Sequence, residues 1–450
     1  MSNNNPAVMT REQAQALCDR ILRLSQAERA QVNVGSGWTG NTRFAANQMS
    51  TSGSVENVGI GIQSWFGARS AVATTNDLSD AGLERTVRSS EALARIAPED
   101  PEDMPLLGPQ TYRPVPAFFD PTANCTADER ARAAMTALEV TRRAGDLDAA
   151  GYIVATAGSN ALANTAGLFA YHQATNGSYT LTVRTADGTG SGWASTGHQD
   201  WSRMNFAGVS ERAIAKARAS RNPVAIEPGR YTVILEPQAV GDLVQLMVFA
   251  ANARNADEGR SAFTREGGGN KIGEQVVDPR ITLYSDPQDP DLLGQPFDGS
   301  GLPLARQAWI ENGVLRELIY SRYWAQRQNR QPTGGPSTIK MVGGDMTVDQ
   351  MIASTERGVL VTRLWYLRQV DPRTILYTGL TRDGTFLVEN GRISRSIRNF
   401  RFNESPLFML NNLEALGPTE RLSGTEAGGN IVMPAIKVRD FNFTSLSEAV

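Results

Sequence analysis

The sequence predicts an α+β protein: an N-terminal α+β half made of two helix/β-meander units, then a mostly antiparallel β C-terminal domain with one prominent helix. Two observations support this fold class. A helix, a series of strand-like segments and a second helix follow one another twice within the first 222 residues. From Pro223 onward, alternating apolar runs are separated by Asn-Gly pairs, which are the strongest short-range signal for a hairpin. A length of 450 residues favours about three domains, which we place at 1–110, 111–222 and 223–450.

The first unit is expected to open with a capped helix and to close with a linker. Thr10 and Gln13 form a capping-box pattern, and apolar residues follow at helical spacing. A second helix should start at Ser79 and end before Pro98. The segment 98–116 is rich in proline and acidic residues, so it cannot hold a regular element. Between the two helices we expect four short strands, at residues 30–34, 42–49, 58–64 and 68–75.

The second unit repeats this order loosely. We expect helices at about 127–144 and 210–220. Three strands should lie between them, at 151–157, 167–173 and 179–186. The repetition hints at two related units.

The third segment should consist mainly of hairpins. Asn312-Gly313 and Asn390-Gly391 each separate two alternating apolar runs, and Asp383-Gly384 predicts a third turn. The exception is a strand at 231–235 that ends at Glu236 and Pro237 and leads into a helix. The predicted buried face of this helix consists of Val240, Leu243, Val244, Met247 and Ala251.

Composition and charge exclude several functional classes. The formal net charge of −3 provides no general basic field for nucleic acid. No apolar run approaches the ~20 residues that span a bilayer, and the N-terminal sequence lacks the pattern of a secretory signal. Cys18 and Cys125 are the only cysteines, as expected in a reducing compartment. We therefore expect a cytoplasmic protein without a nucleic-acid or membrane partner.

Few residues could carry metal or nucleophilic chemistry. The chain has two histidines, His172 and His198, and it lacks both a G-x-S-x-G elbow and a phosphate-binding P-loop. We expect the glycine clusters at 188–192 and 266–273 to be flexible loops. Arginines recur at every third position from Arg392 to Arg401; they could bind carboxylates or a peptide backbone, although a solvated strand face is the simpler interpretation.

The strand-to-helix corner at 235–242 has the spacing of a metal site but not its ligands. Pro237 cannot bind a metal, and Gln238 cannot serve as a general base. Asp242 could be a ligand, but one carboxylate does not make a site. The residues alone therefore favour a structural corner.

Eight segments, in order along nearly the whole chain, resemble the TldD/PmbA family, whose members were historically named modulators of DNA gyrase. They include "TRFAANQMSTS", "GRYTVILEPQAVGDLV", "RSAFTREGGGNKIGEQVVDPRITLYSD" and "FLVENGRISRSIRNFRFNESP". The resemblance implies a heterodimeric protease. Its TldD-type subunit carries zinc on H-E-x-x-x-H plus a C-terminal cysteine, and its TldE (PmbA)-type subunit lacks these residues.

Carried over position by position, the first histidine falls on Pro237, the glutamate on Gln238 and the second histidine on Asp242. The cysteine falls on Ser423. The resemblance thus implies a degenerate metal site with no catalytic residue and no cofactor in this chain, and zinc in a TldD-like partner subunit.

The expected role is a non-catalytic TldE/PmbA-like subunit that shares a peptide-binding chamber with its partner and acts on peptides or on unfolded or modified precursor polypeptides. We expect peptide or partner contacts from a predicted strand at 260–263, through Arg260, Ser261 and Phe263, and from Arg398 and Arg401. Two alternatives remain open. The chain could be an autonomous homodimeric hydrolase using another constellation, such as Asp242 with His198 and a metal, or it could be a peptide- or partner-binding protein.

Overall fold

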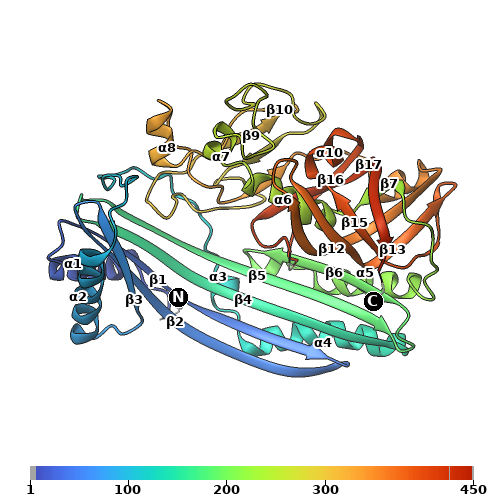
Figure 1. The fold of residues 1–450 in the computed structure, drawn as a ribbon. Coiled ribbons are helices and arrows are strands. Elements are labelled where there is room, and N and C mark those ends of the chain that lie inside the picture. The colour runs from blue at the N-terminus through green and yellow to red at the C-terminus, as the bar shows by residue number, and fades with distance from the viewer. Residues whose placement is uncertain (1–6, 425, 448–450) are drawn as a thin grey trace.

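The computed structural model describes residues 7–424 and 426–447, so the outermost ends of the predicted first and third domains lie outside the described residues. Within this part of the chain, the fold is the expected α+β architecture with a large antiparallel sheet in the N-terminal half and a mixed sheet in the C-terminal half (Figure 1). The helices are α1 (Arg11–Leu24), α2 (Asp80–Ile96), α3 (Asp120–Ala123), α4 (Ala127–Ala144), the 3-10 turn η1 (Trp201–Arg203), α5 (Phe206–Ala219), α6 (Pro237–Phe249), α7 (Ala253–Asp257), α8 (Arg322–Arg327), α9 (Val348–Ala353) and α10 (Pro406–Asn411).

The strands of the first sheet are long. They are β1 (Arg29–Ala45), β2 (Gln48–Phe66), β3 (Arg69–Thr75), β4 (Leu147–Asn164), β5 (Phe169–Thr185) and β6 (Ser191–His198). They pair in the order β3-β2-β1-β4-β5-β6, and every pair is antiparallel. The strands of the two predicted units therefore belong to one sheet, joined where β1 pairs with β4.

Several predicted strands were too short, and one was wrong. The expected strand at 42–49 instead contains the turn between β1 and β2, where Ala46 and Asn47 have φ of 47° and 57°. Asparagine tolerates this left-handed conformation because its side chain can bond locally. We expected breaks at the polar, glycine-rich residues between the predicted strands. These residues instead continue β1 and β2, because neighbouring strands satisfy their backbone groups.

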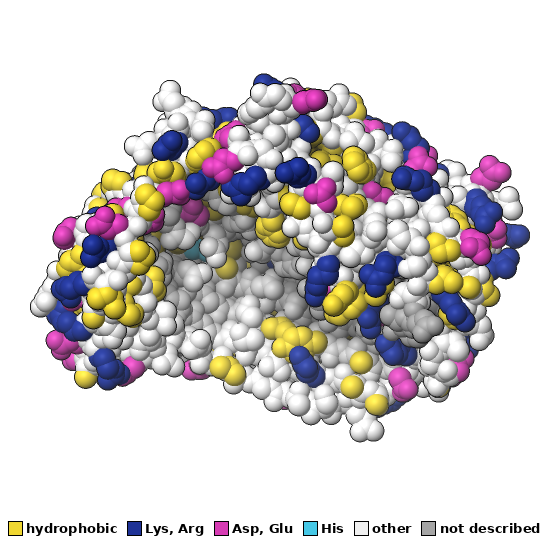
Figure 2. All heavy atoms as spheres, viewed as in Figure 1, with side chains coloured by type: hydrophobic (Ala, Val, Ile, Leu, Met, Phe, Trp, Pro, Cys, Tyr) yellow, Lys and Arg dark blue, Asp and Glu magenta, His cyan; other side chains and the backbone are white. Residues whose placement is uncertain are grey.

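The helices of the N-terminal half leave one face of this sheet partly open. Val34 of β1 pairs with Ala161 of β4, and both pack against α1 and α2. Gly35 and Asn160 are the next pair along, so they face the other side. A hollow of about 590 Å³ lies on that side, and Figure 2 shows the same face of the molecule hollowed between its two ends. Its lining residues are small or uncharged, and they include Gly37, Asn57 and His172.

The second sheet is formed by β7 (Arg230–Leu235), β8 (Leu283–Ser285), β9 (Gln307–Glu311), β10 (Val314–Leu315), β11 (Ile339–Met341), β12 (Arg357–Asp371), β13 (Leu376–Glu389), β14 (Arg392–Ser396), β15 (Phe400–Glu404), β16 (Leu413–Arg421) and β17 (Ile431–Leu446). Strands β17, β15, β13, β12 and β7 form a ring, because β7 also pairs with β17. The largest core surrounds α6 and includes all five residues of its predicted buried face.

Both Asn-Gly hairpins are confirmed. Asn312-Gly313 joins β9 to β10, and Asn390-Gly391 joins β13 to β14; all four residues have positive φ, as a type I′ turn requires. The predicted turn at Asp383-Gly384 is wrong. These two residues also have positive φ, but they form an irregularity inside β13, whose pairing with β12 continues on both sides.

Candidate functional site

The strand-to-helix corner belongs to the C-terminal domain and faces strand β6 of the N-terminal half. Strand β7 pairs with β12 on one side and β17 on the other, and it ends directly before Glu236, the N-cap of α6. Pro237 occupies the first helical position, where a missing backbone N–H costs nothing. Gln238 and Asp242 are four residues apart and therefore share one face of the helix.

These two side chains form a closed polar network. The Nε2 atom of Gln238 donates to Asp242 Oδ1 at 2.8 Å and to the carbonyl of Ala427 at 2.8 Å. The Ala427 N–H donates to Asp242 Oδ1 at 3.1 Å, and the Leu364 N–H donates to Oδ2 at 3.0 Å. Both carboxylate oxygens are thus engaged by groups of the protein itself, and Asp242 is only 1% exposed.

Burial raises the pKa of Asp242 to about 7, against the lowering effect of the hydrogen bonds from Gln238 and Leu364. A carboxyl group that titrates near neutrality can be a general base when it reaches a substrate. Asp242 does not meet this condition, because it is enclosed and both oxygens are occupied. Its environment is that of a structural acid.

The corner does not fit a zinc ion. Pro237 offers no donor atom, and the Gln238 amide points its N–H groups toward Asp242 and Ala427. Gln238 Oε1 is buried without a hydrogen-bond partner, but a single amide oxygen is a poor zinc ligand. Over the described residues, no group of three His, Cys, Asp or Glu side chains could hold a metal, which leaves the alternative of Asp242 with His198 without a ligand set.

Ser423 lies in the segment that closes this corner. The next residue, Gly424, packs so closely on Gln238 that an added Cβ would lie 2.2 Å from Nε2. Ser423 itself is 5% exposed and lies against Gly197 of β6, where an added Cβ would be 3.1 Å from Ser423 Cβ. Position 423 is therefore held close to positions 237, 238 and 242 of α6, from which it is far apart in sequence, in one small region that faces β6 of the N-terminal half.

A cleft of about 220 Å³ opens beside the corner. Pro237 and Gln238 line one wall, and Trp193 and Ala194 of β6 line another. Lys216 of α5 and Glu236 form an ion pair of 2.5 Å across this cleft. Sequence reasoning did not single out Lys216 or Arg421, which also lines the cleft, because no local motif marks either residue.

The predicted contact strand at 260–263 is not a strand. Residues 261–263 form a bend and turn, and Phe263 is 1% exposed within the main core, so it cannot contact a peptide. Ser261 is also buried, and its Oγ accepts from the Phe263 N–H at 3.2 Å. Arg260 is exposed but pairs with Glu258.

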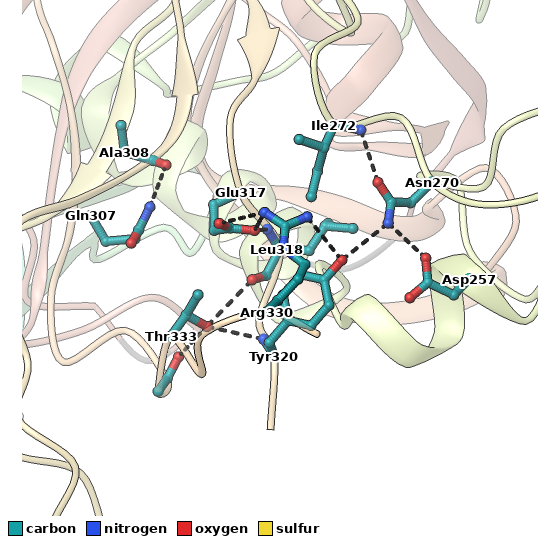
Figure 3. Close-up of polar contacts among 11 residues, drawn as sticks. Asp257, Asn270, Ile272, Gln307, Ala308, Glu317, Leu318, Tyr320, Arg330 and Thr333 are labelled. Atoms are coloured by element: carbon teal, nitrogen blue, oxygen red, sulfur yellow. Dashed lines mark hydrogen bonds and ion pairs between the residues drawn. The ribbon is translucent and has the colours of Figure 1, made fainter. Parts of the chain in front are cut away.

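The glycine-rich loop at 266–273 is held by a polar network with residues between 257 and 333, which Figure 3 shows in close-up. Asn270, in the glycine-rich loop, donates to Asp257 Oδ1 at 2.6 Å and to the Tyr320 hydroxyl at 3.1 Å. Arg330 donates to the same hydroxyl and pairs with Glu317 at 2.9 Å. This network places the glycine-rich loop in a structural role.

The row of arginines is a solvated surface. Arg392, Arg395, Arg398 and Arg401 are all exposed. Arg398 lines a cavity of about 500 Å³ between the two halves, whereas Arg401 donates to Thr378 Oγ1 at 3.4 Å on β13. The two predicted contact residues therefore do not share one site.

The histidines do not join the corner network. Burial lowers the pKa of His172 to about 4, and its Nε2 has no hydrogen-bond partner among the described residues. The Nδ1 atom of His198 accepts from the Asp200 N–H at 2.8 Å, and burial lowers its pKa as well.

Comparison with known proteins agrees with this architecture. Three domain models of one family match the chain in order: PmbA/TldA metallopeptidase domain 1 at residues 30–94, the central domain at 125–221 and the C-terminal domain at 228–445. The chain belongs to the PmbA/TldD family of metallopeptidase homologues.

Individual relatives are distant. The chain is 23% identical to the metalloprotease PmbA of Escherichia coli O157:H7 over 415 residues, which cover 86% of this chain and 88% of that protein. It is 25% identical to a metalloprotease of Methanothermobacter thermautotrophicus over 232 residues, and this match spans 48% of each protein.

Solved structures show the same fold. TldE from Thermococcus kodakarensis superposes with a TM-score of 0.85 at 17% identity, covering 96% of this chain and 99% of that one. A protein described as a modulator of DNA gyrase from Thermotoga maritima gives a TM-score of 0.84 at 18% identity, covering 96% and 100%. At these identities the likeness establishes the fold alone.

Among the described helices, none is both long and apolar enough to cross a membrane.

Proposed function

We propose that this chain is the non-catalytic, TldE/PmbA-like subunit of a cytoplasmic TldD/TldE-type zinc metallopeptidase complex. The observation that carries the proposal is the closed network at the corner: Asp242 accepts from Gln238 and from two backbone N–H groups, where the family's catalytic subunits would place a metal ligand. The chain keeps the fold of the family while its corner residues do not fit zinc.

Such a subunit would form one wall of the peptide-binding chamber that it shares with its partner. The hollow over the first sheet, of about 590 Å³, is large enough for several residues of peptide, and its lining contains no Lys, Arg, Asp or Glu side chain that would select for charge. We propose that it accepts peptides or segments of unfolded or modified precursors, which the zinc site of a TldD-like partner then cleaves.

Metal analysis and activity assays test the proposal. The purified chain should contain no stoichiometric zinc and should hydrolyse no peptide alone, whereas hydrolysis should appear on adding the TldD-type protein of the same organism. Bound zinc together with activity in the isolated chain would establish the autonomous hydrolase instead.

Co-expression with the TldD-type protein, followed by mass measurement, tests the assembly directly. A complex containing both chains is expected. If only homodimers form, and a pull-down recovers a different partner without any TldD-like protease, the binding-protein alternative replaces this proposal.

A further inference from the structure

The cleft beside α6 contains a positive charge that the rest of the protein leaves uncompensated. Arg421, the last residue of β16, donates from Nε to the Gly429 carbonyl at 3.2 Å and from Nη2 to Asn176 Oδ1 at 2.9 Å. Its Nη1 atom is buried and has no hydrogen-bond partner among the described residues. Over the same residues, no carboxylate lies within ion-pair distance of its guanidinium, and burial lowers its pKa to about 10.

The other charges of this cleft are paired with one another. Lys216 pairs with Glu236 at 2.5 Å, and Arg212 lies 3.8 Å from Glu420. Arg421 lies in the wall between this cleft and a second one of about 420 Å³, and it lines both. After these pairings, Arg421 is the one cationic side chain of the cleft beside α6 that has no ion-pair partner among the described residues, while the second cleft also contains the exposed carboxylate of Glu211.

The helix start provides a second, independent feature that favours an anion. The first residues of α6, Pro237 and Gln238, line the same cleft, and no side chain caps this thirteen-residue helix. An uncapped N-terminus carries free N–H groups and a partial positive charge. Glu236 at the N-cap does not neutralise it by hydrogen bonding and is instead held by Lys216.

We propose that this cleft binds a carboxylate group of a peptide, with the guanidinium of Arg421 as its principal cationic partner. A single negative charge matches the single uncompensated guanidinium. A phosphate would carry about two negative charges next to Glu236 and Glu420, so it fits this cleft less well. This inference rests on the proposed function: the corner lacks the metal ligands, but the cleft beside it keeps a positively charged side chain that positions a peptide.

Calorimetric titration of the isolated chain with three short peptides tests the inference. The probes are acetyl-Ala-Ala-Ala with a free carboxylate, the same peptide with an amidated C-terminus, and amidated acetyl-Ala-Glu-Ala. We expect the free acid to bind at least ~10-fold more tightly than its amide, as a charge-assisted hydrogen bond provides. Binding of the glutamate peptide would identify a side-chain carboxylate as a ligand, and its failure to bind would restrict the site to chain termini.

Arg421→Gln should abolish the preference for the acid, whereas Arg143→Gln should retain it. Arg143 is an exposed arginine on α4, so this control removes the same charge from the molecule without touching the cleft. If Arg421→Gln fails to fold, Arg421→Lys keeps the charge and should reduce the preference. In the unmodified chain, the acid but not the amide should slow backbone amide exchange across residues 413–424.

Equal binding of acid and amide, or a preference that survives Arg421→Gln, would overturn the inference. The test is independent of the proposed assembly, because the mass of the complex with a TldD-type subunit is measured separately. An Arg421→Gln chain that still assembles but shows no acid preference supports both proposals. A chain that binds the acid through Arg421 but forms no such complex contradicts the assembly alone.

Discussion

At the scale of single residues, the candidate site is defined by close fit rather than by reactive groups. The side-chain amide of Gln238 donates to the carbonyl of Ala427. Gly424 has no side chain, which leaves room for this amide. The sequence predicted the position of this corner and its lack of ligands. It could not predict the contacts of Ala427 or Arg421, because these residues are about 180 positions away from α6 and no local pattern marks them.

Gly424→Ala tests this fit. The new Cβ would lie 2.2 Å from Gln238 Nε2 and 2.5 Å from its Cδ, so the buried network must shift, at a cost of about 1–3 kcal/mol in the free energy of unfolding. Gly59→Ala in β2 is the matched control. No atom lies within 4 Å of its added Cβ, so its unfolding free energy should stay the same or rise slightly. Urea denaturation of both variants measures the difference, and equal midpoints would contradict the argument.

Because the imidazole of His172 is buried, we expect the free energy of unfolding to depend on pH. Its pKa is about 4 in the folded protein, whereas an unfolded histidine titrates near ~6.5. Between these values the unfolded state binds more protons, so stability should decrease as the pH falls from about 6.5 to 4. The loss is about 3 kcal/mol for a shift of this size.

The His172→Gln variant should lack this component. We expect the stability advantage of the unmodified protein over the variant to shrink by this amount across that window, measured by urea unfolding at several pH values. His198→Gln is the control, since His198 is less buried and should contribute a smaller change. Parallel pH profiles for His172→Gln and the unmodified protein would show that His172 is not the cause.

At the scale of elements, residue pairs that favour a turn predicted a hairpin correctly only where tertiary contacts did not impose another structure. The two Asn-Gly pairs form hairpins, whereas Asp383-Gly384 has the same backbone preference but stays within β13. The difference lies in tertiary contacts. Asp383 is 2% exposed, accepts from Arg363 Nε at 2.8 Å and from Ser191 Oγ at 2.6 Å, and so fixes an irregularity instead of a turn.

Asp383→Asn should therefore be strongly destabilising. It leaves the buried guanidinium of Arg363 without a counter-charge, which costs about 3–5 kcal/mol. Adding Arg363→Met should restore part of this loss, because the uncompensated charge is then removed. Glu139→Gln breaks an exposed pair with Arg143 and should cost less than ~0.5 kcal/mol. Thermal or urea unfolding distinguishes these cases, and a near-neutral Asp383→Asn would rule out a structural role for the pair.

At the scale of the whole molecule, the joining of two units into one sheet could not be predicted from local sequence. The pattern of helices and strands suggested two units, but the pairing of β1 with β4 brings together residues more than a hundred positions apart. Alternation of apolar residues predicts which side of a strand is buried, not which strand lies beside it. The hollow follows from this pairing, since its lining comes from β1, β2, β4 and β5 together.

The two halves are connected by a small apolar contact on the open face of the first sheet. Phe297, from the C-terminal half, packs with Leu162, Leu168 and Ala170 of the N-terminal half. Its ring lies 5.2 Å from that of Tyr112, whose hydroxyl donates to the Gly301 carbonyl at 2.7 Å. This contact covers one part of the sheet face and leaves the hollow beside it.

Phe297→Ala should weaken the connection between the halves. Loss of a buried phenylalanine costs about 3–5 kcal/mol, and because the contact joins two cores, the halves should also unfold less cooperatively. Amide exchange measured by mass spectrometry at increasing urea should show residues 147–185 and 357–389 opening at separate concentrations in this variant and together in the unmodified protein. Phe249→Ala, at an exposed site ending α6, removes the same side chain and should keep a single transition. If Phe297→Ala also unfolds in one step, the polar contacts across the junction suffice to couple the two halves.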